Sequence, residues 1–259
     1  MSGRSCSFGP VTLEPTAWLR ILRAEPAAAR TLVCFPPGGG SASAYRELAA
    51  ALAPGTTVAA VQYPGRQDRF GEPLAESIAA MADAVTEDLI RLPTEPGLAL
   101  FGHSMGATVA FETARRLSAA GRGPTVLIVS GRPDPRYVEP GALHEAPDSA
   151  LIADLERLAD DPGSVAVLRA DPGLAELVLP AVRADYRAVE TYRFEPGEPL
   201  RCPVVALVSD ADPTTTPEQA DGWREHTSGP FERLLFPGGH FYLDAAVAEV
   251  AAAISARLR

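Results

Sequence analysis

Short apolar runs alternate with longer helical patterns along this chain, and that order constrains its fold more than any other feature of the sequence. The runs typical of strands cover residues 31–35, 57–62, 98–101, 125–130, 204–209 and 231–236. The patterns typical of helices cover residues 45–52, 76–92, 105–120 and 245–258. Strands that are apolar almost throughout are covered on both faces, so the alternation predicts an α/β fold with a mostly parallel sheet flanked by helices. We expect residues 18–22 to add an antiparallel strand at one edge.

One long interval interrupts this alternation, between the predicted strands that end at residue 130 and begin at residue 204. It is too long for a bare loop. Asp148 is placed to cap a first helix within it, and a second helical pattern follows Pro180. We interpret residues 132–200 as an inserted helical lid, whose apolar side chains serve either as core or as pocket lining. Because the chain has no repeat or low-complexity linker, we predict a single α/β domain over residues 1–259.

Charge and hydropathy exclude several classes of protein. The formal net charge of −10 repels a phosphate backbone, so we expect no nucleic-acid binding. No apolar run approaches the length that crosses a bilayer, and residues 1–10 are too polar for a secretory signal, so we expect a cytoplasmic protein with no membrane contact. Cys6, Cys34 and Cys202 have no paired spacing, so the sequence predicts neither a metal site nor a disulfide framework.

The strongest local signal is Gly-His-Ser-Met-Gly at residues 102–106, between an apolar run and a helical pattern. A nucleophile on a sharp strand-to-helix turn needs small neighbours, and Gly102 and Gly106 provide that room. This arrangement is typical of the nucleophile elbow of α/β-hydrolases, and it makes Ser104 the candidate nucleophile. The alternative is a glycine-rich turn with an incidental serine. We assign the adjacent His103 to packing rather than to catalysis.

A serine nucleophile needs a base, and the order serine, acid, histidine is expected along this fold. Among the 4 histidines, His240 fits that order, because it follows the predicted strand 231–236 on a Pro-Gly-Gly turn. Asp210 and Asp212 both follow the predicted strand 204–209. We prefer Asp212 as the acid, because its Asp-Pro step opens a loop in which the carboxylate is free to turn toward the histidine. Spacing alone leaves Asp210 as an alternative.

Acyl transfer also needs two backbone N–H groups to hold an oxyanion. The residue after the nucleophile, Met105, provides one. The second is expected in the loop after the predicted strand 31–35, where Pro36 and Pro37 have no N–H, so we choose Gly38. A phosphate-binding loop would end in Gly-Lys-Ser/Thr, which this loop lacks.

Six motifs occur together and in order along the chain: Cys-Phe-Pro with a glycine loop from 34, Tyr-Pro-Gly-Arg at 63–66, Gly-His-Ser-Met-Gly at 102–106, Arg-Ala-Asp at 183–185, Trp-Arg-Glu-His-Thr at 223–227 and Phe-Pro-Gly-Gly-His-Phe at 236–241. With these motifs the chain resembles the stand-alone type II thioesterases that accompany polyketide and nonribosomal peptide synthases. The resemblance runs from about Trp18 to Leu243. Two positions depart from the family pattern: Pro37-Gly38 stands where the family often has His-Ala, and Thr215 where it often has an apolar residue.

The resemblance implies hydrolysis of acyl groups from the phosphopantetheine thiol of acyl or peptidyl carrier proteins, which removes wrong or stalled units. It maps the family triad onto Ser104, Asp212 and His240 and favours Asp212 over Asp210. It implies no metal and no cofactor beyond the phosphopantetheine carried by the substrate.

The sequence leaves the acyl chain length, the pathway and the oligomeric state open, although a monomer is compatible with it. Carrier proteins are usually acidic, so docking to this acidic chain needs a local basic patch. The candidates are Arg66, Arg69, Arg183 and Arg187, with ordinary solvated arginines as the alternative. Two other functions stay open: a carboxylesterase for a free small ester, and a non-catalytic acyl- or carrier-binding protein with a vestigial triad.

Overall fold

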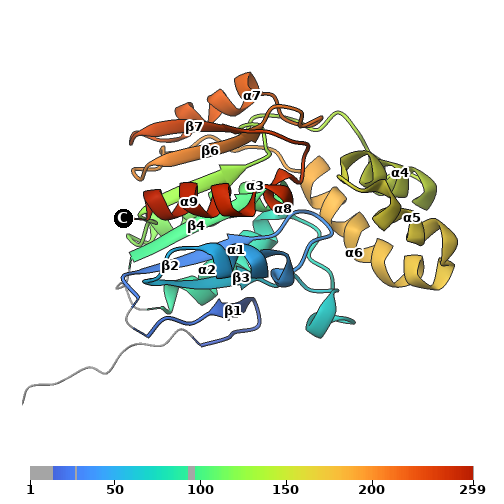
Figure 1. The fold of residues 1–259 in the computed structure, drawn as a ribbon, viewed down its shortest axis with the longest axis horizontal. Coiled ribbons are helices and arrows are strands. Elements are labelled where there is room, and N and C mark those ends of the chain that lie inside the picture. Colours follow the sequence, from blue (N-terminus) through green and yellow to red (C-terminus); the bar gives the residue numbers. More distant parts are fainter. Residues whose placement is uncertain (1–13, 27, 93–96, 259) are drawn as a thin grey trace, which may run out of the picture.

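The structure is a computed structural model that describes residues 14–26, 28–92 and 97–258. Cys6 and the polar residues 1–10, discussed above, lie outside the described residues. Within the described part, one 7-stranded sheet has the order β1-β3-β2-β4-β5-β6-β7 (Figure 1). Its strands are β1 Leu19–Arg23, β2 Arg30–Phe35, β3 Thr56–Val61, β4 Gly97–His103, β5 Val126–Ser130, β6 Val204–Ser209 and β7 Phe231–Phe236.

The edge strand β1 pairs antiparallel with β3, and the other neighbouring strands of this sheet pair parallel. The predicted α/β fold with a mostly parallel sheet is therefore confirmed. Strand β4 runs two residues further than its apolar run, because Gly102 and His103 still pair with Val129 and Ser130 of β5. The sheet thus continues to the residue before Ser104.

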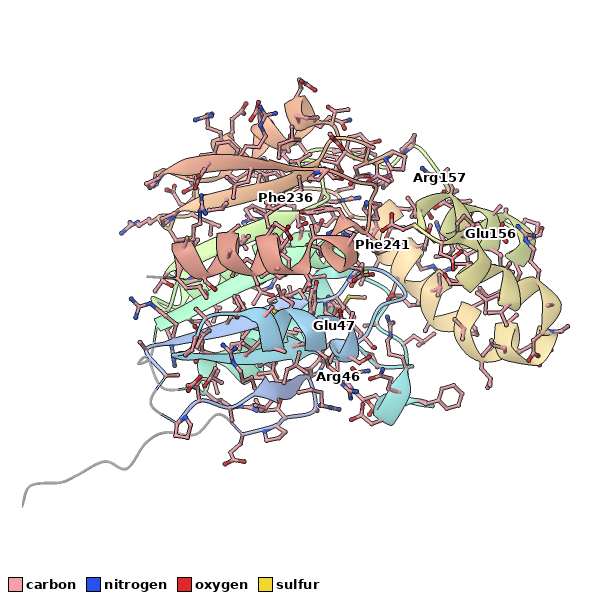
Figure 2. The ribbon with its side chains drawn as sticks, viewed as in Figure 1. Arg46, Glu47, Glu156, Arg157, Phe236 and Phe241 are labelled. Carbon is pink, nitrogen blue, oxygen red and sulfur yellow. The ribbon has the colours of Figure 1, made fainter. Side chains whose placement is uncertain are left out.

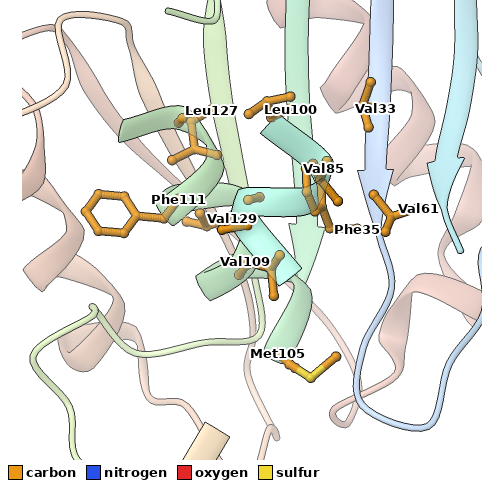
Figure 3. Close-up of a cluster of buried hydrophobic side chains, with 14 of the residues drawn as sticks. Val33, Phe35, Val61, Val85, Leu100, Met105, Val109, Phe111, Leu127 and Val129 are labelled. Atoms are coloured by element: carbon orange, nitrogen blue, oxygen red, sulfur yellow. The ribbon is translucent and has the colours of Figure 1, made fainter. Parts of the chain in front are cut away.

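Helices cover both faces of the sheet. Those of the α/β part are α1 Arg46–Ala51, α2 Ile78–Ile90, α3 Met105–Ala119, α7 Pro217–Asp221, α8 Tyr242–Ala245 and α9 Val247–Arg257. Alternate strand residues face opposite sides. On one side, Leu100 and Val129 share a buried cluster with side chains of α2 and α3 (Figure 3). On the other, Phe101 and Ile128 share one with α1 and α9. Two buried faces explain strands that are apolar throughout.

The segment between β5 and β6 carries a short 3-10 helix, η3 Leu143–Glu145, and the helices α4 Asp148–Leu158, α5 Pro162–Ala170 and α6 Pro172–Glu190. We call these elements the insertion; they lie together at one end of the sheet (Figure 1). They have a buried apolar cluster of their own, formed by Leu151, Ile152, Leu168, Leu179 and Val182. The apolar stripe of the predicted lid is therefore core in part, and its other members line cavities.

Two details of the predicted insertion are wrong. Asp148 does not cap α4: the N-cap position is Pro147, and the Asp148 carboxylate instead pairs with Arg183 at 2.5 Å. The second helix does not begin after Pro180, because α6 begins at Pro172 and runs through Pro180. A proline inside a helix removes one backbone hydrogen bond. The adjacent Leu179 lies in the apolar cluster, so packing holds the helix together at this point.

Residues 14–26, 28–92 and 97–258 contain no helix with both the length and the apolarity to cross a membrane. The same residues contain no group of three or more His, Cys, Asp or Glu side chains arranged to hold a metal ion.

Candidate active site

Ser104 lies on a strained turn between β4 and α3. Its backbone has φ 54° and ψ −123°, a left-handed conformation that costs a non-glycine residue roughly 1–3 kcal/mol. Its two glycine neighbours have no space for a side chain. A Cβ on Gly102 would lie 2.2 Å from the carbonyl oxygen of Gly106, and a Cβ on Gly106 would lie 2.0 Å from that of Phe35. The Ser104 N–H donates to Ser130 O at 2.8 Å, so the neighbouring strand holds the strained residue.

His240 and Asp212 form a buried pair at the carboxyl ends of β7 and β6. The imidazole Nδ1 lies 2.9 Å from Asp212 Oδ2 and 3.1 Å from Oδ1. The exposed fractions of the two side chains are 2% and 0%. Asp212 Oδ1 also accepts from the N–H of Thr214 at 2.8 Å and from its hydroxyl at 2.7 Å. The sequence analysis did not identify Thr214.

These contacts set the charge of Asp212. Burial raises the pKa of this carboxyl, but the hydrogen bond and charge of His240 and the two hydrogen bonds from Thr214 outweigh it. The pKa of Asp212 therefore lies below its ordinary value of 3.8, and the group is ionised at neutral pH. An ionised carboxylate at Nδ1 orients the ring and stabilises a positive charge on it.

Asp210, the alternative acid, has a different environment. Its side chain is exposed, and its Oδ1 accepts from the Gly238 N–H at 3.0 Å. The next residue, Ala211, donates its N–H to Gly238 O at 3.1 Å. Asp210 thus ties the loop that carries His240 to the end of β6, whereas Asp212 contacts the ring itself.

Gly38 and Met105 lie with Ser104 and His240 around one cavity of about 250 Å³, which we call the serine cavity. Met105 is the first residue of α3, where backbone N–H groups have no partner within the helix. In the loop after β2, the Gly39 N–H donates to Asp185 at 2.7 Å and the Gly40 N–H to Pro37 O at 2.9 Å. Among the described residues, the Gly38 N–H forms no hydrogen bond.

The insertion contributes much of the wall of the serine cavity. Its lining side chains include Leu155, Leu158, Tyr186 and Val189. A larger cavity of about 850 Å³ shares Gly38, Leu155 and Phe241 with the first and extends between the glycine loop, α1 and α5. Figure 2 shows Phe241 on the side of the α/β part that faces the insertion.

His103 packs beneath the His240 ring, with 4.9 Å between the ring centroids. Its Nδ1 lies 3.0 Å from Ser130 Oγ, which lies 2.6 Å from the Tyr242 hydroxyl. Its Nε2 is buried with no hydrogen-bond partner among the described residues. Burial, and then the neighbouring His240, hold the pKa of His103 well below its ordinary value of 6.5, so this ring stays neutral. The polar contacts to Ser130 and Tyr242 were not predicted.

The arginines predicted as a docking patch are used within the fold. The side chains of Arg66 and Arg69 are only 11% and 8% exposed, so the prediction is wrong for these two. Both guanidinium groups are held by carboxylates and are not available to a partner. The four ion pairs join Arg66 to Asp185, Arg69 to Glu72, Arg183 to Asp148 and Arg187 to Glu76.

Comparison with known proteins shows the family to which this chain belongs. The family model described as "Thioesterase domain" matches residues 30–258. The chain is 44% identical to a probable cadicidin biosynthesis thioesterase of Streptomyces griseus, over 94% of this chain and 68% of that protein. It is 43% identical to the thioesterase PikA5 of Streptomyces venezuelae, over 91% of this chain and 83% of that protein.

Solved structures agree with these relatives. The type II thioesterase BorB from the borrelidin biosynthetic cluster superposes with a TM-score of 0.85 at 44% identity, covering 95% of this chain and 100% of that one. The type II thioesterase YbtT of the yersiniabactin pathway superposes with a TM-score of 0.85 at 31% identity, covering 93% of this chain and 98% of that one. The chain therefore belongs to the thioesterase family and is a serine thioester hydrolase with the α/β-hydrolase fold.

Proposed function

We propose that this chain is a type II thioesterase that removes wrong or stalled acyl groups from the phosphopantetheine thiol of acyl or peptidyl carrier proteins. One observation carries the proposal. His240, which is paired with the buried carboxylate of Asp212, lines the same cavity as Ser104 on its strained turn. The names of two relatives, YbtT and ClbQ, assign them to nonribosomal peptide and polyketide pathways, and this supports the class of substrate.

In the first step, His240 Nε2 takes the proton of Ser104 as its hydroxyl attacks the thioester carbonyl. Asp212 keeps the proton of His240 on Nδ1, so that Nε2 is free to act as the base. The N–H groups of Gly38 and Met105 hold the oxyanion. The partial positive charge at the N-terminus of α3 stabilises the oxyanion further. The tetrahedral intermediate then collapses, the carbon–sulfur bond breaks, and the pantetheine sulfur leaves as a thiol with the proton from His240, which is neutral again.

In the second step, water attacks the acyl-serine, with His240 again as base, and the carboxylic acid leaves as Ser104 regains its proton. A thiolate is a better leaving group than an alkoxide, so protonation of the leaving group matters less than in an ester hydrolase. The first step uses only the residues named above, the second adds one water, and neither calls for a metal or a redox cofactor.

The two cavities suit a thioester. They meet at Gly38 and Phe241, so a carbonyl held at Ser104 has one cavity for the acyl group and another for the thiol arm. In this proposal the insertion is the lid of a single α/β-hydrolase domain, and the enzyme works in the cytoplasm beside its synthase.

The test compares three kinds of reagent. A fluorophosphonate should label the protein, and the Ser104→Ala variant should not be labelled. Mass spectrometry of a panel of acyl-loaded carrier proteins should show loss of the acyl mass, with oxygen esters of the same acyl groups turned over more slowly. A clear preference for oxygen esters would favour a carboxylesterase, and failure of labelling would favour a binding protein with a vestigial triad.

A further inference from the structure

Asp185 connects the insertion to the glycine loop. This carboxylate lies on α6 and is 1% exposed. Its Oδ2 accepts from the N–H of Gly39 at 2.7 Å. It also forms a bidentate pair with Arg66, with Nη1 at 2.7 Å from Oδ2 and Nη2 at 2.9 Å from Oδ1. Arg66 Nη1 donates in addition to the carbonyl of Gly40 at 3.0 Å. The pair therefore holds the loop on both sides of Gly39.

The loop needs such an anchor. Residues 38–40 are all glycine, and glycine has the widest conformational freedom of any residue. Gly39 has φ 73°, in the left-handed region. The N–H that would hold the oxyanion belongs to Gly38, one residue before the anchored amide. An oxyanion donor is useful only when it is fixed before the charge develops. The Asp185–Arg66 pair removes the freedom that the glycines provide.

Stability alone does not account for a buried ion pair. Desolvation of two buried charges offsets much of their attraction, and such pairs are often replaceable by apolar residues without loss of stability. A second ion pair also joins α6 to the α/β part, because Arg187 pairs with Glu76 at 2.7 Å. That pair is half exposed, and within the described part of the chain neither side chain forms a hydrogen bond with the glycine loop. A substitution of Arg187 therefore tests the attachment of α6, whereas substitutions of Asp185 and Arg66 also test the position of the glycine loop.

We infer that Asp185 and Arg66 are positioning residues that set the Gly38 N–H for the oxyanion, so that the placement of helix α6 in the insertion decides whether the oxyanion site is complete. The inference rests on the proposed function, in which Gly38 is an oxyanion donor. A shift of α6 away from the loop would release the Gly39 N–H and leave the serine and the histidine in place.

The test measures kcat and KM on a small thioester without a carrier protein. Asp185→Asn keeps the size of the side chain and removes its charge, and Arg66→Lys keeps the charge and loses the bidentate contact. We expect either change to lower kcat by roughly 10- to 100-fold with KM within about twofold, because a misplaced donor loses part of the 10²–10³ that removal of a donor costs. Arg187→Ala, the matched control, should keep kcat within about twofold.

Two further measurements separate positioning from folding. The double variant Arg66→Met/Asp185→Leu leaves no unpaired buried charge, so it should fold, and its kcat should still fall because the Gly39 N–H has lost its acceptor. The acid limb of the kcat/KM profile against pH should not move in any of these variants, because the His240–Asp212 pair is intact. A folded double variant with the kcat of the parent chain, or an Arg187→Ala variant as impaired as Asp185→Asn, would overturn the inference. If Ser104→Ala were inactive in the same assay, such a result would refute the inference about Asp185 and Arg66 and leave the proposed function standing.

Discussion

The Asp212→Asn variant gives the sharpest test of the site. Asp212 accepts from both polar groups of Thr214 and from His240 Nδ1 with no exposure to solvent. An asparagine of the same shape can keep the Thr214 contacts through its oxygen, and it then presents its NH₂ group to His240. Two donors cannot face each other, so His240 gives up the proton on Nδ1 and carries it on Nε2. In that tautomer Nε2 has no lone pair with which to accept the Ser104 proton.

The expected loss follows from this tautomer. Locking a catalytic histidine in the wrong tautomer costs on the order of 10³–10⁴ in kcat. At about 1.4 kcal/mol per tenfold change, the activation barrier rises by about 4 to 5.5 kcal/mol. The free energy of unfolding should change much less, because size and most hydrogen bonds are kept.

Asp210→Asn is the matched control. Asp210 is exposed and contacts the Gly238 N–H rather than the ring, and an asparagine oxygen accepts that hydrogen bond equally well. We expect its kcat to stay within about threefold of the parent chain. The assay is turnover of a small thioester at neutral pH, together with the rate of fluorophosphonate labelling and a urea unfolding curve. If Asp212→Asn kept a tenth of the parent kcat, or if Asp210→Asn lost more than Asp212→Asn, the assignment of the acid would be refuted.

Three further predictions concern the elbow and its surroundings. Both Ser104→Gly and Ser104→Ala should be inactive, but urea unfolding should show the glycine variant to be more stable than the alanine variant by about 1–2 kcal/mol, because glycine relieves the strained φ; equal stabilities would argue against strain. Gly106→Ala should lower the free energy of unfolding by about 3 kcal/mol or more, because its Cβ would lie 2.0 Å from a carbonyl oxygen, whereas Gly173→Ala, with its nearest contact at 3.4 Å, should change it by less than about 1 kcal/mol. Burial lowers the pKa of His103, so below pH 6.5 the unfolded state binds a proton at this residue and the folded state does not. The free energy of unfolding should therefore fall by up to about 1.4 kcal/mol for each pH unit below 6.5. His103→Asn should flatten that slope in unfolding curves measured between pH 7 and 5, and an unchanged slope would assign it to other groups.

The sequence was sufficient for most of the sheet, because the strands β2 to β6 are largely buried on both faces and form apolar runs that are followed by turns. Strands β6 and β7 have the predicted limits. The insertion was harder to predict. Helix α5 was missed although Asp161 caps it by accepting from the Gly163 N–H at 2.9 Å. An Asp-Pro pair opens both α5 and α6, and this start signal is stronger than Pro180, which was taken as a boundary.

At the site, a different kind of information was lacking. Ser104 is readable because the strain of the elbow demands glycines nearby in sequence. No sequence pattern marks Thr214 or the Ser130–Tyr242 contact, because hydroxyl residues are common near strand ends and their partners lie on other elements. The Asp185–Arg66 pair joins residues 119 positions apart, so the sequence did not predict the contact. Asp185 was noted only within a family motif, and Arg66 within another motif and as a docking candidate.

The sequence is least informative about the path by which the loop after β7 brings His240 toward Ser104. The strand order places β5 and β6 between β4, which ends at the nucleophile, and β7, which precedes the histidine. At about 4.8 Å per strand, the ends of β4 and β7 are about 14 Å apart, so a histidine that simply followed its strand would not reach the serine. The loop after β7 is drawn back across β6 by the Ser209 hydroxyl, which donates to Gly239 O at 2.7 Å, and by the contact of Ala211 with Gly238. Gly238 permits this path because its φ is 122°. The ring then rests on His103, which belongs to β4 itself, so the residue before the nucleophile also supports the base.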